Sequence, residues 1–230
     1  MCRIDLIDLL ACVEDYVLLK RSETFPYYNP GSDVDLLVMD REEALRSIRS
    51  FYEALKATDW EMSVTDTPGH CHVDFIFSGE LDIRVDLIDG FDFYTKFVVK
   101  PSFLVKVFRD RQMWTCDRGD YFVPASEDDL TIRYFEYLEY FDQLPDKIKH
   151  LDYICGEENE LLKRRFFENT HRFIRFKRKE WVEPVKAAKY SEEVNSCRIA
   201  MKNTWDSIRV LVKVVWRSSY KTMLRYSKQK

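Results

Sequence analysis

The segment that decides the fold runs Gly31-Ser32-Asp33-Val34-Asp35-Leu36-Leu37-Val38. Alternate side chains of a β-strand point to the same face, so Asp33 and Asp35 should lie side by side, while the apolar residues that follow anchor the strand in a core. Two carboxylates held this close raise each other's pKa, and a divalent cation relieves that cost. Because Mg²⁺ binds a few carboxylates together with phosphate oxygens, the segment predicts the beginning of a metal site.

A later strand supplies a third candidate ligand, Asp86. Polar and apolar residues alternate from Asp82 to Ile88, so Asp82, Arg84 and Asp86 should share one face of that strand. Asp74, on the strand before it, is a weaker candidate for the same cluster. An Asp-x-Asp pair alone carries little information, since 22 aspartates in 230 residues give about two such pairs by chance. The glycine-containing loop, the apolar strand and the third acid give the pattern its specificity.

The rest of the first half alternates strands with helices. Asp40 should cap a helix, with Glu43 three residues later. Residues 98–114 and 121–123 have the composition of further strands or irregular structure around a turn at 117–120. Helices are expected over residues 4–15, 40–55, 126–141 (with Ser126 as the N-cap) and 145–154, and strands over residues 16–19, 34–39, 60–64, 72–77 and 81–88.

The pattern changes at Pro124, where helical spacing replaces strand alternation. Residues 157–225 keep the helical spacing, with a break at Pro184. We therefore predict an α/β (α+β) fold, in which a domain of residues 1–123 with a mixed sheet and flanking helices precedes an all-helical domain of residues 124–230.

The order of these features resembles the DNA polymerase beta-like nucleotidyltransferase superfamily, which combines a loop, an Asp-apolar-Asp strand, a helix and a later strand with a third Asp. The family signature begins with a Gly-Ser pair before the two aspartates. Ser22 lies 11 positions before Asp33, where the family's serine would fall, but Arg21 stands in place of the glycine. The resemblance covers about residues 4–90, and residues 123–130 are also similar to nucleotidyltransferase-like proteins of bacterial surface-glycan clusters.

The resemblance implies transfer of a nucleoside monophosphate from a nucleoside triphosphate to a small acceptor, such as a sugar, a sugar phosphate or another part of a glycan. Asp33, Asp35 and Asp86 would hold two Mg²⁺ ions, and Asp86 would help to activate the acceptor hydroxyl. Lys20 and Arg21 could supply positive charge to the phosphates where the family uses its glycine. The nucleotide-binding residues implied in this way are Lys20, Arg21, Ser22, Gly31 and Ser32.

The charge is distributed unevenly and leaves two other functions open. From Leu161 onward there are 19 Lys and Arg against six Asp and Glu, whereas residues 1–160 hold 17 against 34. The basic region could bind RNA, which would make the protein an RNA-modifying nucleotidyltransferase, or it could simply attract the acidic half. Residues 163–179 mix cations with aromatics, as in RNA binding or in an amphipathic helix that buries Phe166 and Phe173. The arginine at the glycine position instead favours a catalytically inactive fold that binds a partner.

Several other residues of the sequence carry weaker functional signals. His70 and His72 flank Cys71 on one strand and could form a metal pair, although no further ligand is evident. Tyr27 and Tyr28 could stack on a base or pack beneath their loop. The six cysteines form no C-x-x-C pair. We expect no signal peptide at the N-terminus, and the tail 217–230 could touch an anionic membrane surface. With no apolar run of about 20 residues, we expect a soluble cytoplasmic protein without a transmembrane segment.

Overall fold

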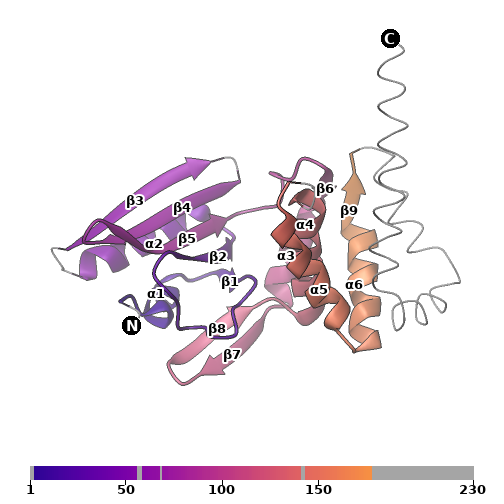
Figure 1. Cartoon of the computed structure of the whole chain (residues 1–230), viewed down its shortest axis with the longest axis horizontal. Helices are drawn as coiled ribbons and strands as arrows, with labels where there is room; N and C mark the ends of the chain where they lie inside the picture. Colours follow the sequence, from indigo (N-terminus) through magenta and orange to yellow (C-terminus); the bar gives the residue numbers. More distant parts are fainter. Residues whose placement is uncertain (1–2, 56–58, 68, 141–142, 178–230) are drawn as a thin grey trace, which may run out of the picture. The chain divides into compact units, whose positions relative to one another are not determined.

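A five-stranded mixed sheet forms the centre of the N-terminal half of this protein in the computed structural model, which describes residues 3–55, 59–67, 69–140 and 143–177. The strand order is β1-β2-β5-β4-β3 (Figure 1), in which β2 and β5 run parallel and the other neighbours run antiparallel. The prediction of a mixed sheet is confirmed. The strands are β1 (Tyr16–Leu18), β2 (Ser32–Val38), β3 (Trp60–Thr67), β4 (His70–Phe77) and β5 (Glu80–Ile88).

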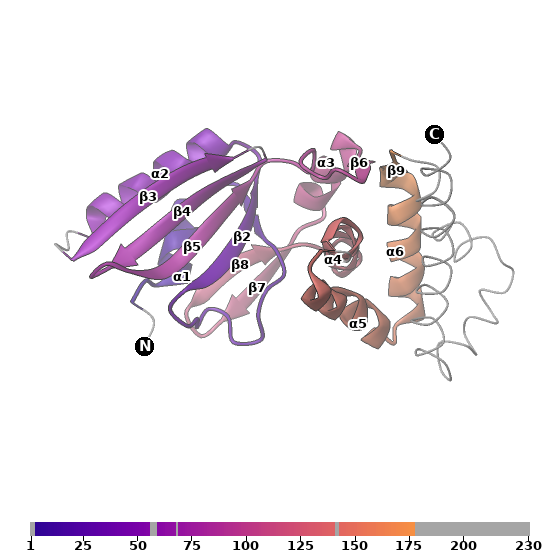
Figure 2. The same ribbon diagram turned by 45° about the horizontal axis from the view of Figure 1, so that its top comes forward.

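Two helices, α1 (Leu6–Cys12) and α2 (Arg41–Ala54), cover one face of the sheet (Figure 2). Their apolar side chains share a buried core with the inward residues of β2, which are Val34, Leu36 and Val38. The Asp40 carboxylate accepts a hydrogen bond from the Glu43 backbone N–H, as the sequence predicts for the beginning of α2. The first helix is shorter than the predicted span of residues 4–15.

A second core forms at the other face, where β2 and β5 end. Leu37 and Ile88 are buried there among aromatic side chains, of which Phe103 and Phe135 are fully buried. The elements around this core are α3 (Pro101–Arg109), α4 (Ser126–Tyr140), α6 (Glu160–Phe173), β6 (Phe97–Val99) and β9 (Ile174–Phe176). The outward face of β2 thus changes from carboxylates at its beginning to a buried leucine near its end.

The expectation of strands or irregular structure over residues 98–114 is wrong for α3. The segment is rich in valine and phenylalanine, which favour strands, but Phe103 and Val107 are four residues apart and both are buried on one side of a helix. Pro101 lies in the first turn, where its missing N–H costs nothing. A hairpin follows, made of β7 (Gln112–Cys116) and β8 (Gly119–Val123).

The helices after Pro124 agree with the prediction in outline. Ser126 is the first residue of α4 rather than its cap, and the Ala125 carbonyl accepts the first hydrogen bonds, from the Asp128 and Asp129 backbone N–H groups. A 3₁₀ turn, η1 (Pro145–Lys147), leads into α5 (Ile148–Gly156), and α4 packs against both α5 and α6.

The expectation of helix throughout the C-terminal region is wrong at residues 174–176, which form β9 and pair with β6. The β-branched Ile174 and the aromatic Phe176 fit a strand beside another apolar strand. Residues 178–230, with Pro184 and the tail 217–230, lie outside the described part of the chain, so the boundary at 123/124 and the all-helical domain stay predictions. Within the described residues, no helix has the length and hydrophobicity needed to cross a membrane.

Candidate metal centre

The parallel pairing of β2 with β5 creates the candidate metal centre. Asp35 lies opposite Asp86, and Asp33 lies opposite Arg84 in the same register. The ligand oxygens of Asp33, Asp35 and Asp86 all lie within 4.8 Å of one another. These side chains project from the face opposite α1 and α2, because they alternate with the core residues Val34 and Leu36. The structure therefore brings together the three carboxylates singled out in the sequence.

Lys20 also reaches this cluster, from the end of β1. The Leu19 backbone N–H donates to the Asp35 carbonyl oxygen, which fixes the chain beside β2, and Lys20 then adopts a left-handed conformation with φ 48°. The Lys20 Nζ lies 2.6 Å from Asp35 Oδ2 and 3.7 Å from Glu136 Oε1. Glu136 comes from α4 and also pairs with Lys147 at 2.9 Å. Sequence reasoning missed Glu136, since nothing near it in the sequence connects it with β2.

Burial and charge act against each other at these groups. Burial alone would lower the pKa of Lys20, but Asp35 and Glu136 outweigh it and raise that pKa, so the ammonium stays charged. Burial raises the pKa of Asp35, and Lys20 opposes this only in part. Burial would also raise the pKa of Glu136, but Lys20 and Lys147 outweigh it and lower that pKa. A further cation beside Asp35 would favour its ionised form.

The neighbouring strand β4 adds two polar side chains to the same face. His72 lies opposite Asp86, and its Nδ1 is 2.6 Å from Asp86 Oδ1. Asp74 lies opposite Arg84 and accepts two hydrogen bonds from its guanidinium, at 2.6 and 2.8 Å. These bonds lower the pKa of Asp74. Asp74 therefore pairs with Arg84 and does not join the carboxylate cluster.

Arg21 and Ser22 make contacts elsewhere. The Arg21 guanidinium donates to the Tyr121 hydroxyl at 2.8 Å and lies 4.0 Å from the centre of the Trp114 ring, so it binds the β7–β8 hairpin. Ser22 is exposed, and its hydroxyl lies 3.4 Å from that of Thr24. Of the three residues predicted to meet phosphate at the end of β1, Lys20 alone has a described contact with the carboxylate cluster.

Gly31 and Ser32 hold the loop in front of β2. Gly31 has φ +81°, a conformation that favours glycine, and its N–H donates to the Asp82 carbonyl oxygen at 2.8 Å. The Ser32 N–H donates to the Asn29 carbonyl. These bonds fix the position where the strand begins, one residue before Asp33.

Asp82 differs from the expectation that it shares a face with Arg84 and Asp86. The register shifts between Phe75 and Ile76, so that Asp82 is the extra residue of a β-bulge. Its carboxylate accepts a 2.6 Å hydrogen bond from the Tyr28 hydroxyl, and the Tyr28 side chain packs against the core that α1 and α2 share with the sheet.

The two tyrosines of this loop have different surroundings. Tyr28 packs beneath its loop, as one of the two interpretations of the sequence predicted. Tyr27 is 52% exposed, and its hydroxyl donates to Asp117 of the hairpin turn.

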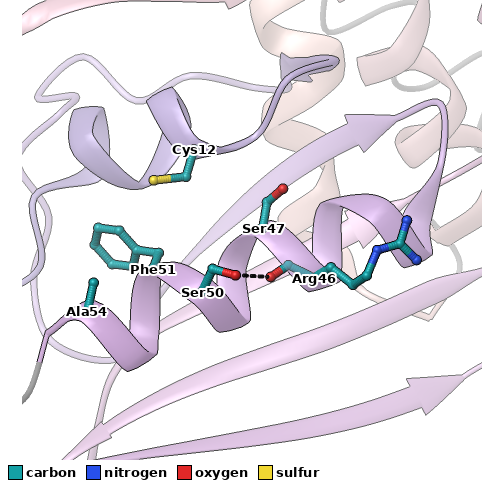
Figure 3. A pocket seen from close by; sticks show the side chains of 6 residues that line it. All are labelled: Cys12, Arg46, Ser47, Ser50, Phe51 and Ala54. Atoms are coloured by element: carbon teal, nitrogen blue, oxygen red, sulfur yellow. Dashed lines mark hydrogen bonds between the residues drawn. The ribbon is translucent and has the colours of Figure 1, made fainter.

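The surface between α1 and α2 carries a separate shallow hollow (Figure 3). Its wall includes Cys12, Phe51 and Ser50, whose hydroxyl donates to the Arg46 carbonyl oxygen. Because α1 and α2 cover the opposite face of the sheet, this hollow does not belong to the carboxylate cluster. It also lacks a convergent set of titratable groups.

The basic helix α6 follows the amphipathic interpretation where it is described. Phe166 and Phe173 are each 3% exposed, while the side chain of Arg164 is 77% exposed. Most of the basic region lies beyond residue 177. Comparison of the chain with models of known protein families gave no match, and comparison with curated proteins gave none either.

Proposed function

We propose that this protein is a Mg²⁺-dependent nucleotidyltransferase, which moves a nucleoside monophosphate from a nucleoside triphosphate to a small acceptor such as a sugar or sugar phosphate. The observation that carries the proposal is the convergence of Asp33, Asp35 and Asp86 on one face of a parallel strand pair. The resemblance of the segment Ser22–Asp35 to the polymerase beta-like superfamily supports the same reaction.

The donor set suits hard divalent cations. Three carboxylates from two adjacent strands offer oxygens that lie within 4.8 Å of one another. Among the described residues, the Lys20 ammonium lies within hydrogen-bond distance of the aspartates of β2, at 2.6 Å from Asp35. Mg²⁺ prefers this arrangement, because it takes one or two carboxylates and completes its shell with water and phosphate oxygens. Asp33 is exposed, which leaves the cluster open to a ligand.

The reaction itself is an in-line displacement. The acceptor oxygen forms a bond to the α-phosphorus, the bond to the pyrophosphate oxygen breaks, and pyrophosphate leaves with that electron pair. Two bound Mg²⁺ ions would supply neutralisation of the charge on the attacking and leaving oxygens. The Asp86 carboxylate, whose Oδ1 lies 2.6 Å from His72 Nδ1, would take up the acceptor hydroxyl proton.

Lys20 gives the site a fixed positive charge on the side of β1. Its ammonium is held by Asp35 and Glu136, and its raised pKa keeps it protonated at neutral pH. A triphosphate that approaches the cluster would meet this charge without further rearrangement of the backbone.

Nucleotide binding can be tested by thermal unfolding. The wild-type protein and the double variant Asp33→Asn/Asp35→Asn are titrated with ATP, GTP, CTP and UTP, each with and without Mg²⁺. A nucleotide at a hundred times its dissociation constant should add about 2.7 kcal/mol to the unfolding free energy. We expect one nucleotide to stabilise the wild type only with Mg²⁺, and the double variant to lose that effect.

A control carries the same substitutions away from the sheet, on the exposed hairpin residues Asp117 and Asp120. Asp117→Asn/Asp120→Asn should keep the wild-type response. If a folded wild-type protein responds to none of the four nucleotides, the proposal fails.

A second candidate function is a catalytically inactive fold that binds a partner. It is favoured by Arg21, which stands where the family has its glycine and is engaged with Trp114 and Tyr121 of the hairpin. Nucleotide binding without release of pyrophosphate, measured with a phosphate-coupled assay, would select this alternative.

A further inference from the structure

We propose that His70, His72 and Asp86 form a second cation site on the same sheet, selective for a divalent transition ion such as Zn²⁺, with the Asp86 carboxylate shared between this site and the carboxylate cluster. His70 and His72 have no part in the proposed nucleotide transfer, so the second site stands on separate observations.

The three ligands come from adjacent strands in register. His70 and His72 are two residues apart on β4, which places both imidazoles on one face with ring centres 5.8 Å apart. His72 lies opposite Asp86 of β5. One nitrogen of each histidine and one oxygen of Asp86 all lie within 4.8 Å of one another. Cys71, between the histidines, is 2% exposed in the opposite core and takes no part.

His70 carries a nitrogen that its present contacts leave unbonded. The Nε2 of His70 is buried and has no hydrogen-bond partner among the described residues. A buried nitrogen left in this way costs free energy, which a bond to a cation would recover. Among the three ligands, His70 is therefore the one that the present contacts explain least.

The local backbone keeps the His70 ring in place. The Phe93 ring meets that of His70 edge to face, with centres 4.3 Å apart. Gly69 precedes His70 with φ +81°, and a Cβ at this position would lie 2.6 Å from Phe93 Cδ1. The turn and the phenylalanine thus restrict the imidazole to the sheet face that carries Asp86.

The ligand types determine the class of ion. Imidazole nitrogen favours Zn²⁺ and its neighbours in the transition series, whereas Mg²⁺ prefers oxygen. Three protein ligands leave a fourth position for water or substrate, as in catalytic zinc sites. Zinc bonds of about 2.0–2.1 Å place tetrahedral ligands roughly 3.4 Å apart. Side-chain rotations would therefore replace the 2.6 Å contact between His72 and Asp86 with bonds to the ion.

The alternative is that His72 and Asp86 form only an ion pair. Their 2.6 Å contact joins His72 Nδ1 to Asp86 Oδ1. This alternative gives no role to His70. It predicts that the two histidines do not act together on a metal, which a binding experiment can decide.

The test uses the full-length protein after removal of metals with EDTA. ZnCl₂ and MgCl₂ are titrated separately by calorimetry into the wild type, His70→Gln, His72→Gln and Asp33→Asn. We expect one Zn²⁺ site in the wild type, a loss of affinity of at least tenfold in each histidine variant, and no change in Asp33→Asn. Mg²⁺ binding should show the reverse, with a loss in Asp33→Asn and none in His70→Gln.

Three further measurements keep the result specific. His171→Gln, on the exposed side of α6, should bind Zn²⁺ as the wild type does. The absorption spectrum of the Co²⁺ form should show tetrahedral bands without thiolate charge transfer, and His72→Gln should lose them. Thermal unfolding of each variant establishes that it is folded.

The other possible outcomes separate failure of the Zn²⁺ site from failure of the nucleotidyltransferase proposal. Equal Zn²⁺ affinity in the wild type and both histidine variants, or no Zn²⁺ binding by the folded wild type, would overturn the second site. Because nucleotide-dependent stabilisation is measured separately, its persistence would leave the nucleotidyltransferase proposal intact when the Zn²⁺ site fails. If Zn²⁺ binds but no nucleotide stabilises the protein, the Zn²⁺ site stands and the nucleotidyltransferase proposal fails.

Discussion

Asp35 of β2 and Asp86 of β5 occupy the same register position of a parallel strand pair, with Lys20 Nζ 2.6 Å from Asp35 and His72 Nδ1 2.6 Å from Asp86. Each carboxylate thus has its own basic partner, one on either side of the pair. A shift of one residue in the β2–β5 register would separate Asp35 from Asp86, because it would turn the side chains of one strand to the opposite face. The candidate centre consequently depends on strand pairing more than on any loop.

Removal of the Lys20 charge should destabilise the protein in a way that Mg²⁺ corrects. Lys20→Met leaves Asp35 without its 2.6 Å partner in a largely buried position, and we expect the unfolding free energy to fall by about 3 kcal/mol in EDTA. Mg²⁺ should restore part of this loss, because a cation near Asp35 replaces the ammonium. Denaturant titrations with and without Mg²⁺ measure both effects.

The matched control is Lys147→Met, which removes a partner of Glu136 and leaves Asp35 untouched. Its loss of stability should not respond to Mg²⁺. An equal response of the two variants to Mg²⁺ would contradict the expectation.

Asp33 should be needed for Mg²⁺ binding but not for the stability of the fold. This residue is exposed, and its carboxylate lies near two others. Asp33→Asn removes like-charge repulsion, so the melting temperature in EDTA should stay unchanged or rise slightly, while stabilisation by Mg²⁺ should disappear. Glu61→Gln, an exposed substitution on β3, serves as the control and should keep the Mg²⁺ response. A marked fall in the melting temperature of Asp33→Asn in EDTA would assign this residue a structural role instead.

His150 should make the protein sensitive to mild acid. Burial lowers the pKa of this histidine to about 4. The nearby cations Lys20, Lys147 and Arg133 also lower this pKa, and Glu136 raises it without outweighing them. Between pH 6.5 and 4 the unfolded chain binds a proton that the folded protein does not, so stability falls as the pH drops through this range. The loss should reach about 3 kcal/mol. His150→Leu should flatten the curve of unfolding free energy against pH over this range, and an unchanged slope would refute the assignment.

Asp128 should be the most sensitive polar residue among the helices. It is fully buried and accepts hydrogen bonds from Lys106 Nζ, at 2.6 and 2.8 Å, and from Asn169 Nδ2, at 2.7 Å, so it joins α3, α4 and α6. Asp128→Ala removes the nearest partner of Lys106, which keeps a 3.3 Å contact with Asp110, and leaves the buried Asn169 amide without this acceptor. The change should cost about 3 kcal/mol in urea titrations. Asp129→Ala, which breaks only an i,i+4 pair with Arg133, should cost about 1 kcal/mol or less. Similar losses in the two variants would show that the buried position of Asp128 adds nothing.

The alternation of residues predicted the elements around the carboxylates well. The side chains of Asp33 and Asp35 share a face because a strand has a period of two, and Asp40 caps α2 because its carboxylate reaches the N–H groups of the first turn. The same alternation failed at Asp82, where a β-bulge interrupts the period. The prediction failed again over α3, because valine and phenylalanine favour strands by composition, although Phe103 and Val107 have the spacing of a helix.

The partners of the carboxylates were harder to predict. Glu136 reaches Lys20 from 116 positions away, and His72 meets Asp86 through the pairing of β4 with β5. Such contacts depend on which strands become neighbours and on where α4 packs, and neither is encoded in local spacing. For the same reason the sequence placed Arg21 beside the phosphates, whereas its guanidinium binds Trp114 and Tyr121 of a hairpin almost a hundred residues further on.

Backbone geometry sets the two-residue period of a strand locally, so the amino-acid order alone indicates which side chains of each strand share a face. It therefore specified Asp33, Asp35 and Asp86 as candidates and His70 with His72 as a pair. Local spacing does not reveal that β5 lies between β2 and β4, and this strand order of the folded protein makes Asp86 the common neighbour of both groups. The face that carries the carboxylates is covered near the ends of β2 and β5 by α3, α4 and α6, which lie far along the chain, and that packing is a property of the whole fold.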